Sequence, residues 1–124
     1  MLAGICHLSV FFAPVILPLI IWLAMRQSQP YASKQAKQAF FFHLGFTVLT
    51  VLGVIGAQVF VFSTMVAAGA VSQDPTAPLA VLPLVFLVYG VIFLVGIVDV
   101  VLSVIGAVQA FQGKPFHYPL LGGL

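Results

Sequence analysis

The sequence predicts an all-α integral membrane protein, a helical bundle with three main hydrophobic segments that form a single domain over residues 1–124. Hydrophobic residues make up 63% of the chain and charged residues only 5%, whereas a soluble domain has roughly 45–50% apolar and about 25% charged residues. The apolar stretches are residues 2–25, 39–71 and 79–111. Because four basic and two acidic side chains cannot cover a water-soluble particle of this size, lipid must surround much of the exterior.

The first segment, residues 2–25, is the least regular. Pro14 and Pro18 lie in its middle, and each removes a backbone hydrogen-bond donor. The segment therefore either spans as a kinked helix or enters the bilayer and returns as a re-entrant piece, packed against the other two segments. No basic residue precedes the apolar run, and Arg26 follows it, which indicates a retained membrane segment rather than a cleaved signal peptide.

The second and third segments are longer than a membrane crossing requires. A spanning helix needs roughly 20 apolar residues, so each segment must tilt, project beyond the bilayer or break. Gly53 and Gly56 offer breaks in one segment, and Gly90 and Gly96 in the other. A four-helix alternative divides the third segment between Gly90 and Gly96. Three segments are favoured because no polar turn interrupts either run.

Basic residues predict the orientation of a multi-pass protein in the cell (inner) membrane. Three of the four lie in loop 26–38, and the fourth, Lys114, follows the last segment. Loop 72–78 carries Asp74 and neither Lys nor Arg. The positive-inside rule therefore places loop 26–38 and the C-terminus in the cytoplasm and loop 72–78 outside. The N-terminus is outside if the first segment spans and inside if it is re-entrant.

Asp99 is the sharpest candidate for a functional side chain, because it interrupts the apolar run Val95–Leu102. Acids within membrane segments usually face a bundle interior or a cavity. One interpretation is a proton or cation site, and the other is a structural hydrogen bond to a neighbouring helix. Gln58, deep in the second segment, is the expected partner for such a bond.

Two histidines on different segments, His7 and His43, suggest axial ligation of haem as an alternative. No haem-attachment motif or paired histidine spacing accompanies them, so interfacial hydrogen bonding is favoured and no cofactor or metal is predicted. The single cysteine, Cys6, excludes an internal disulfide and a multi-thiolate metal site. His117 and its neighbours Phe116 and Tyr118 are expected at the membrane–water interface.

Small residues repeat at a spacing of four in the second and third segments, a pattern that lets membrane helices approach closely. It predicts a compact bundle or an oligomer and names no function. The pairs are Gly53 with Ala57, Ser103 with Ala107, and Gly106 with Ala110.

Short motifs near both ends of the chain carry a family resemblance. They are Ile5-Cys-His-Leu-Ser9, Pro14, Pro18-Leu-Ile-Ile-Trp-Leu23, Gln38-Ala-Phe40, Ala107, Ala110, Gly113 and Tyr118-Pro119. Together they resemble the small bacterial membrane proteins grouped with the chloroplast inner-envelope import component, the Tic-twenty-like family, over nearly the whole chain. Members often carry an Asn-Phe-Gln-like cluster where this chain has Phe41-Phe42-His43.

The resemblance implies a polytopic helical membrane protein, and its plant member is implicated in protein translocation. Three functions are therefore weighed. The favoured one is a non-enzymatic accessory or stabilising subunit of a larger membrane complex, in contact with lipid and with other subunits or further copies of itself. The alternatives are a translocation or channel component whose path Asp99 and Gln58 line, and a haem-binding or other redox protein that uses His7 and His43. A net charge of +2 is too small for nucleic-acid binding.

Overall fold

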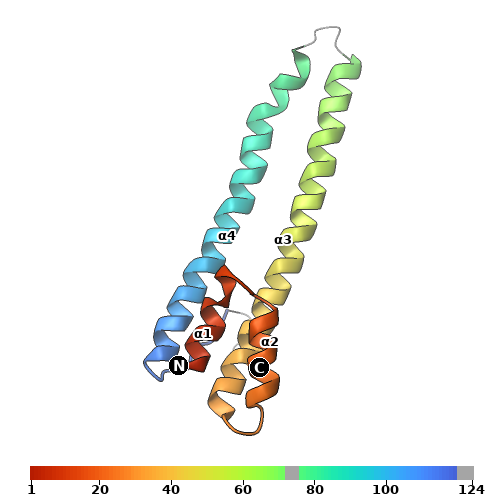
Figure 1. The fold of residues 1–124 in the computed structure, drawn as a ribbon. Coiled ribbons are helices and arrows are strands. Elements are labelled where there is room, and N and C mark those ends of the chain that lie inside the picture. The colour runs from red at the N-terminus through yellow and green to blue at the C-terminus, as the bar shows by residue number, and fades with distance from the viewer. Residues whose placement is uncertain (72–75, 120–124) are drawn as a thin grey trace. The chain divides into compact units, whose positions relative to one another are not determined.

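The computed structural model describes residues 1–71 and 76–119, and within them every regular element is helical, which confirms the all-α fold class. The elements are α1 (Leu2–Leu8), the 3₁₀ helix η1 (Ser9–Phe11), α2 (Ile16–Met25), α3 (Pro30–Val71), the 3₁₀ helix η2 (Ala77–Val81) and α4 (Leu82–Phe111), as Figure 1 shows. Asp74 and most of the predicted outer loop lie outside the described residues.

The chain divides into two compact units. Unit 1 consists of Met1–Thr47 together with Ile97–Leu124, and unit 2 consists of Val48–Gly96. Unit 1 therefore holds α1, η1, α2, the beginning of α3 and the end of α4. Unit 2 holds the remainder of the two long helices and η2.

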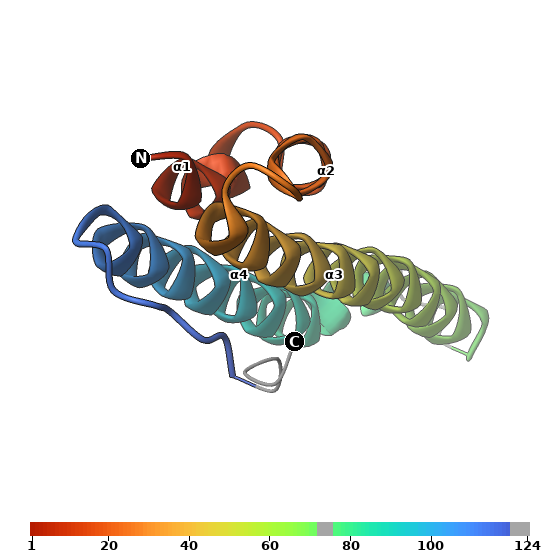
Figure 2. The same cartoon turned by 90° about the horizontal axis from the view of Figure 1, so that it is seen from below.

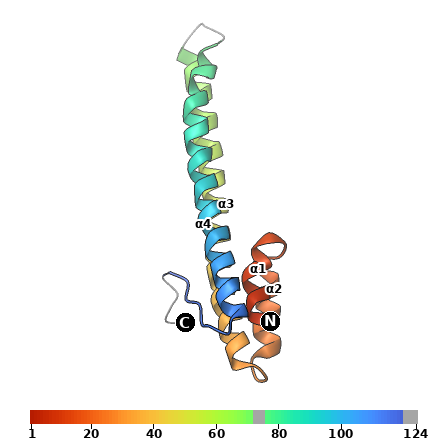
Figure 3. The ribbon, with the colours of Figure 1, turned by 90° about the vertical axis from the view of Figure 1, so that its left-hand side faces the viewer.

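The first segment is a hairpin of two short helices rather than one kinked span. The chain runs along α1, reverses after η1 and returns along α2, which contacts α1 (Figures 1 and 3). Pro14 lies in the reversal, and Pro18 lies in the first turn of α2, where a backbone N–H would have no helical partner. The ten residues of α2 rise only about 15 Å, about half of the hydrocarbon core. Neither α1 nor α2 alone is therefore long enough to cross the hydrocarbon core.

Helix α3 begins nine residues before the predicted start at residue 39. Pro30 suits the first helical position because its ring fixes φ and its missing N–H is not needed there. The Ala, Lys and Gln residues that follow favour a helix. The predicted loop 26–38 therefore shortens to a turn over residues 26–29. Tyr31 and Lys34 are exposed on one face of these turns, while Gln35 and Ala36 are buried on the other. Figure 2 shows α1 and α2 beside this part of α3.

Helix α4 runs without interruption through Gly90 and Gly96, so the predicted alternative division of the third segment does not occur. Its first residues are Leu82 and Pro83, a position at which proline is tolerated. The additional helix comes instead from the break in the first segment. An isolated glycine weakens a helix by only about 1 kcal/mol. No proline or run of polar residues lies beside Gly90 or Gly96, so the helix continues through both.

Among the described residues, two stretches are long and apolar enough to cross a membrane, Pro30–Ala70 and Leu79–Phe111. Only 11% and 0% of their most apolar windows are buried inside the protein. A core helix of a soluble protein would be mostly buried, so these values favour helices that face lipid. In unit 2, large apolar side chains are exposed on both helices, among them Leu52, Phe62, Phe86 and Phe93.

Candidate functional site

Unit 1 encloses a cluster of polar side chains, which we call the polar cluster. Its members come from four segments that are distant in the sequence: α1, α3, α4 and the tail after α4. All are at most 1% exposed except Asp99, which is 9% exposed. The polar cluster comprises His7, Gln35, His43, Asp99, Ser103 and Tyr118.

His7 links three of these segments through its ring nitrogens. Nδ1 lies 2.8 Å from the Tyr118 hydroxyl, and Nε2 lies 3.2 Å from Oε1 of Gln35. A carbonyl oxygen only accepts, so Nε2–H donates to Gln35 and the Tyr118 O–H donates to Nδ1. Burial lowers the pKa of His7 to about 4, against the opposing effect of Gln35. His7 is therefore neutral, as this pattern of one donor and one acceptor requires.

Tyr118 anchors the tail to the helices. Its ring stacks on Phe42 with a centroid separation of 4.0 Å and meets Phe116 edge-on at 4.9 Å. Burial raises the pKa of Tyr118 above its usual range. The Tyr31 hydroxyl also donates to the carbonyl of Lys114 at 2.7 Å. Phe116 and Tyr118 are core residues of unit 1, whereas their predicted position at the membrane–water interface stays a prediction. His117 is exposed.

His43 and Asp99 face each other across α3 and α4. His43 Nδ1 lies 3.4 Å from Asp99 Oδ1, but the atoms are not aligned for a hydrogen bond. Both His43 nitrogens and Asp99 Oδ1 are buried without a hydrogen-bond partner in the described structure. The structure thus places Asp99 beside His43 and not beside Gln58, which is an exposed residue of unit 2. Because α3 starts at Pro30, His43 lies more than three turns inside the helix rather than about one turn from a loop.

The arrangement of His7 does not suit haem ligation. Both of its ring nitrogens are engaged, one by Tyr118 and one by Gln35, so neither is free to bind iron. Among the described residues, no three His, Cys, Asp or Glu side chains are arranged to hold a metal ion. Cys6 is buried, and its thiol donates to the carbonyl of Leu2. Burial raises the pKa of this thiol to about 12, which favours its protonated form.

The small residues near the end of α4 form a closely packed face in unit 1. Ser103, Gly106, Ala107 and Ala110 are all buried. A Cβ atom added to Gly106 would lie 2.8 Å from the ring of Phe116 and 3.0 Å from Nδ1 of His7. Because Gly106 has no side chain, the rings of His7 and Phe116 can pack directly against the backbone of α4.

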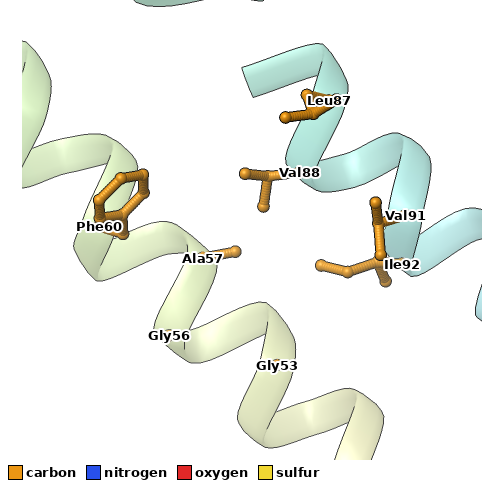
Figure 4. A pocket seen from close by; sticks show the side chains of 8 residues that line it. All are labelled: Gly53, Gly56, Ala57, Phe60, Leu87, Val88, Val91 and Ile92. Atoms are coloured by element: carbon orange, nitrogen blue, oxygen red, sulfur yellow. The ribbon is translucent and has the colours of Figure 1, made fainter. Parts of the chain in front are cut away.

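The other predicted packing pair, Gly53 and Ala57, lies in unit 2 on an open apolar groove. A Cβ added to Gly53 would meet nothing within 4 Å, whereas Ala57 is 7% exposed. The groove encloses about 390 Å³ between α3 and α4. Figure 4 shows its lining, which consists of Gly53, Gly56, Ala57, Phe60, Leu87, Val88, Val91 and Ile92. No lining side chain is polar, so the groove has no group for acid–base or nucleophilic chemistry.

Sequence reasoning missed Gln35 and Tyr118, which complete the hydrogen bonds of His7. Gln35 was assigned to a polar loop because it lies between Lys34 and Lys37. The available signal was the period of the polar residues: Tyr31, Lys34 and Lys37 repeat every three residues, as on the exposed face of a helix. Tyr118 had no comparable signal, since its burial depends on where the tail folds.

Comparison with known proteins identifies the family of this chain. No curated protein and no solved structure matches the chain significantly. A family model, that of the magnetosome magnetite crystal formation protein family (MamF/MmsF), matches residues 1–124. The resemblance to the Tic-twenty-like family is therefore wrong as an assignment, because the model of a different family matches residues 1–124. The chain belongs to the magnetosome magnetite crystal formation protein family.

Proposed function

We propose that this protein is a small non-enzymatic subunit of the magnetosome membrane that supports magnetite crystal formation by binding other membrane proteins. The observation that carries the proposal is the family match over all 124 residues. The exposed apolar faces of both long helices support it, because they provide the surfaces with which a small subunit associates in lipid.

Composition favours an indirect role over contact with the mineral. Carboxylates are the main anionic oxygen ligands that proteins offer to metal cations. The chain has only two acidic residues, and one of them, Asp99, is buried beside His43. A surface that templates an iron oxide would need many exposed carboxylates. The protein therefore acts on crystal growth through the membrane complex to which it belongs.

Deletion of the gene in a magnetite-forming cell tests this role. We expect smaller or fewer crystals by electron microscopy, and recovery of their size when the wild-type protein is restored. A mild-detergent pull-down from the same cells should retain a stoichiometric membrane partner. Unchanged crystals after deletion would contradict a role in crystal formation, and recovery of the protein as a lone monomer would contradict the subunit role.

We propose that the N-terminus, residues 26–29 and Lys114 lie on the cytoplasmic side. The hairpin of α1 and α2 supports this topology, because a hairpin returns the chain to the side from which it entered. In a Cys6→Ser background, we expect a cysteine placed after Met1 and the substitution Ser28→Cys to react with a membrane-impermeant maleimide from the cytoplasmic side. Thr76→Cys should react only from the other side. Labelling of the first cysteine from the side of Thr76 would show that the first segment spans.

A further inference from the structure

The His43–Asp99 pair has the donor set and the spacing of a cation site. We propose that His43 Nδ1 and Asp99 Oδ1 bind one divalent first-row transition-metal cation between α3 and α4. The inference uses the geometry of unit 1 alone and does not depend on the role proposed above.

The first argument is the pattern of unpaired atoms. Buried polar atoms in proteins almost always have a hydrogen-bond partner, so each exception requires an explanation. His43 is 1% exposed, and neither of its ring nitrogens has a partner in the described structure. Oδ1 of Asp99, on α4, also has no hydrogen-bond partner, although it lies 3.4 Å from His43 Nδ1. A cation between Nδ1 and Oδ1 would give a partner to both.

The second argument is the distance between the two atoms. A direct hydrogen bond between nitrogen and oxygen is usually about 2.9 Å long and well aligned, whereas Nδ1 and Oδ1 are 3.4 Å apart and misaligned. Two ligands that are each about 2.1 Å from a tetrahedral cation are themselves about 3.4 Å apart. The separation therefore matches one edge of a tetrahedral site.

The third argument concerns which cation fits. One imidazole nitrogen and one carboxylate oxygen suit iron, cobalt or zinc, whereas calcium and magnesium prefer oxygen ligands alone. The described residues bring no third His, Cys, Asp or Glu to the pair. Ser103 lies one turn after Asp99 on α4, and its buried hydroxyl has no hydrogen-bond partner in the described structure. This hydroxyl and water would be the oxygen donors for the remaining positions. Such an open site exchanges its cation, unlike a closed structural zinc site.

Cobalt(II) binding to the full-length protein in detergent tests the proposal, with the protein purified through a histidine-free tag. We expect about one cobalt per chain by equilibrium dialysis and elemental analysis, and visible absorption bands that indicate imidazole ligation. His43→Gln and Asp99→Asn should each weaken binding by more than about 100-fold, since loss of a second-shell partner alone costs 10–100-fold. His117→Ala is the matched control, because His117 is exposed, and it should bind as the wild type does.

Three results would overturn the proposal: no bound cobalt at millimolar concentration, equal binding by the wild type and both pair variants, or loss of binding in His117→Ala. Size exclusion and circular dichroism show whether each variant is folded. X-ray absorption of the cobalt-loaded wild type needs no variant and should show the outer-shell scattering of one imidazole ring. A spectrum without imidazole scattering would also exclude this site.

Discussion

Tyr118→Ala is expected to lower the free energy of unfolding of unit 1 by about 3–5 kcal/mol, the range for truncation of a buried aromatic residue. The substitution removes the ring that stacks on Phe42 and the hydroxyl that donates to His7. It therefore leaves both a cavity and an unpaired imidazole nitrogen. Unfolding in mixed detergent micelles can be followed by the fluorescence of Trp22, the only tryptophan, which lies in unit 1 against Phe40 and Phe41.

Two further substitutions separate the contributions to this loss. Tyr118→Phe keeps the stacked ring and removes only the hydroxyl, so a smaller loss of about 1–3 kcal/mol is expected from the unpaired Nδ1 of His7. His117→Ala changes the exposed neighbour and should stay within about 0.5 kcal/mol of the wild type. If Tyr118→Ala unfolds no more easily than His117→Ala, the tail is not part of the core of unit 1.

Gly106→Leu is the second substitution with a large expected effect, a loss of about 3 kcal/mol from overpacking and from displacement of a buried hydrogen-bonding group. Even the first added carbon would lie 2.8 Å from Phe116 and 3.0 Å from His7 Nδ1. Neither neighbour can move freely, because Phe116 is only 7% exposed and His7 is held by two hydrogen bonds. The same fluorescence titration measures the change.

Gly96→Leu on the same helix is the matched control. A Cβ at Gly96 would meet nothing within 4 Å, and leucine favours a helix over glycine by up to about 1 kcal/mol. A neutral or slightly stabilising result is therefore expected. Gly4 gives an intermediate case, because the three atoms nearest to its added Cβ all belong to the ring of Phe111, which is 49% exposed. Equal losses for Gly106→Leu and Gly96→Leu would contradict the close packing of α4 in unit 1.

The polar cluster was only partly predictable, for a reason that individual residues illustrate. Asp99 and His7 are conspicuous because polar groups are costly in an apolar segment, so each had to have a partner. The identity of the partner was not accessible. Gln58 lies at a plausible depth in the second segment, yet the structure leaves it exposed and places His43 beside Asp99. The prediction placed His43 near the end of a helix that begins at residue 39. Because α3 begins at Pro30, His43 lies in the interior of the helix instead, where it can face Asp99.

The sequence by itself determined that the protein is all-α, that its long helices are apolar enough to cross a membrane and that the first segment is irregular. These properties depend on composition, on the length of apolar runs and on the positions of Pro14 and Pro18, all of which are local. Only the tertiary structure decided that the first segment is a hairpin, that Tyr118 closes the polar cluster and that Gly106 makes room for His7. These contacts join residues up to 111 positions apart. The pattern of neighbouring residues in the sequence cannot predict which distant side chains come into contact.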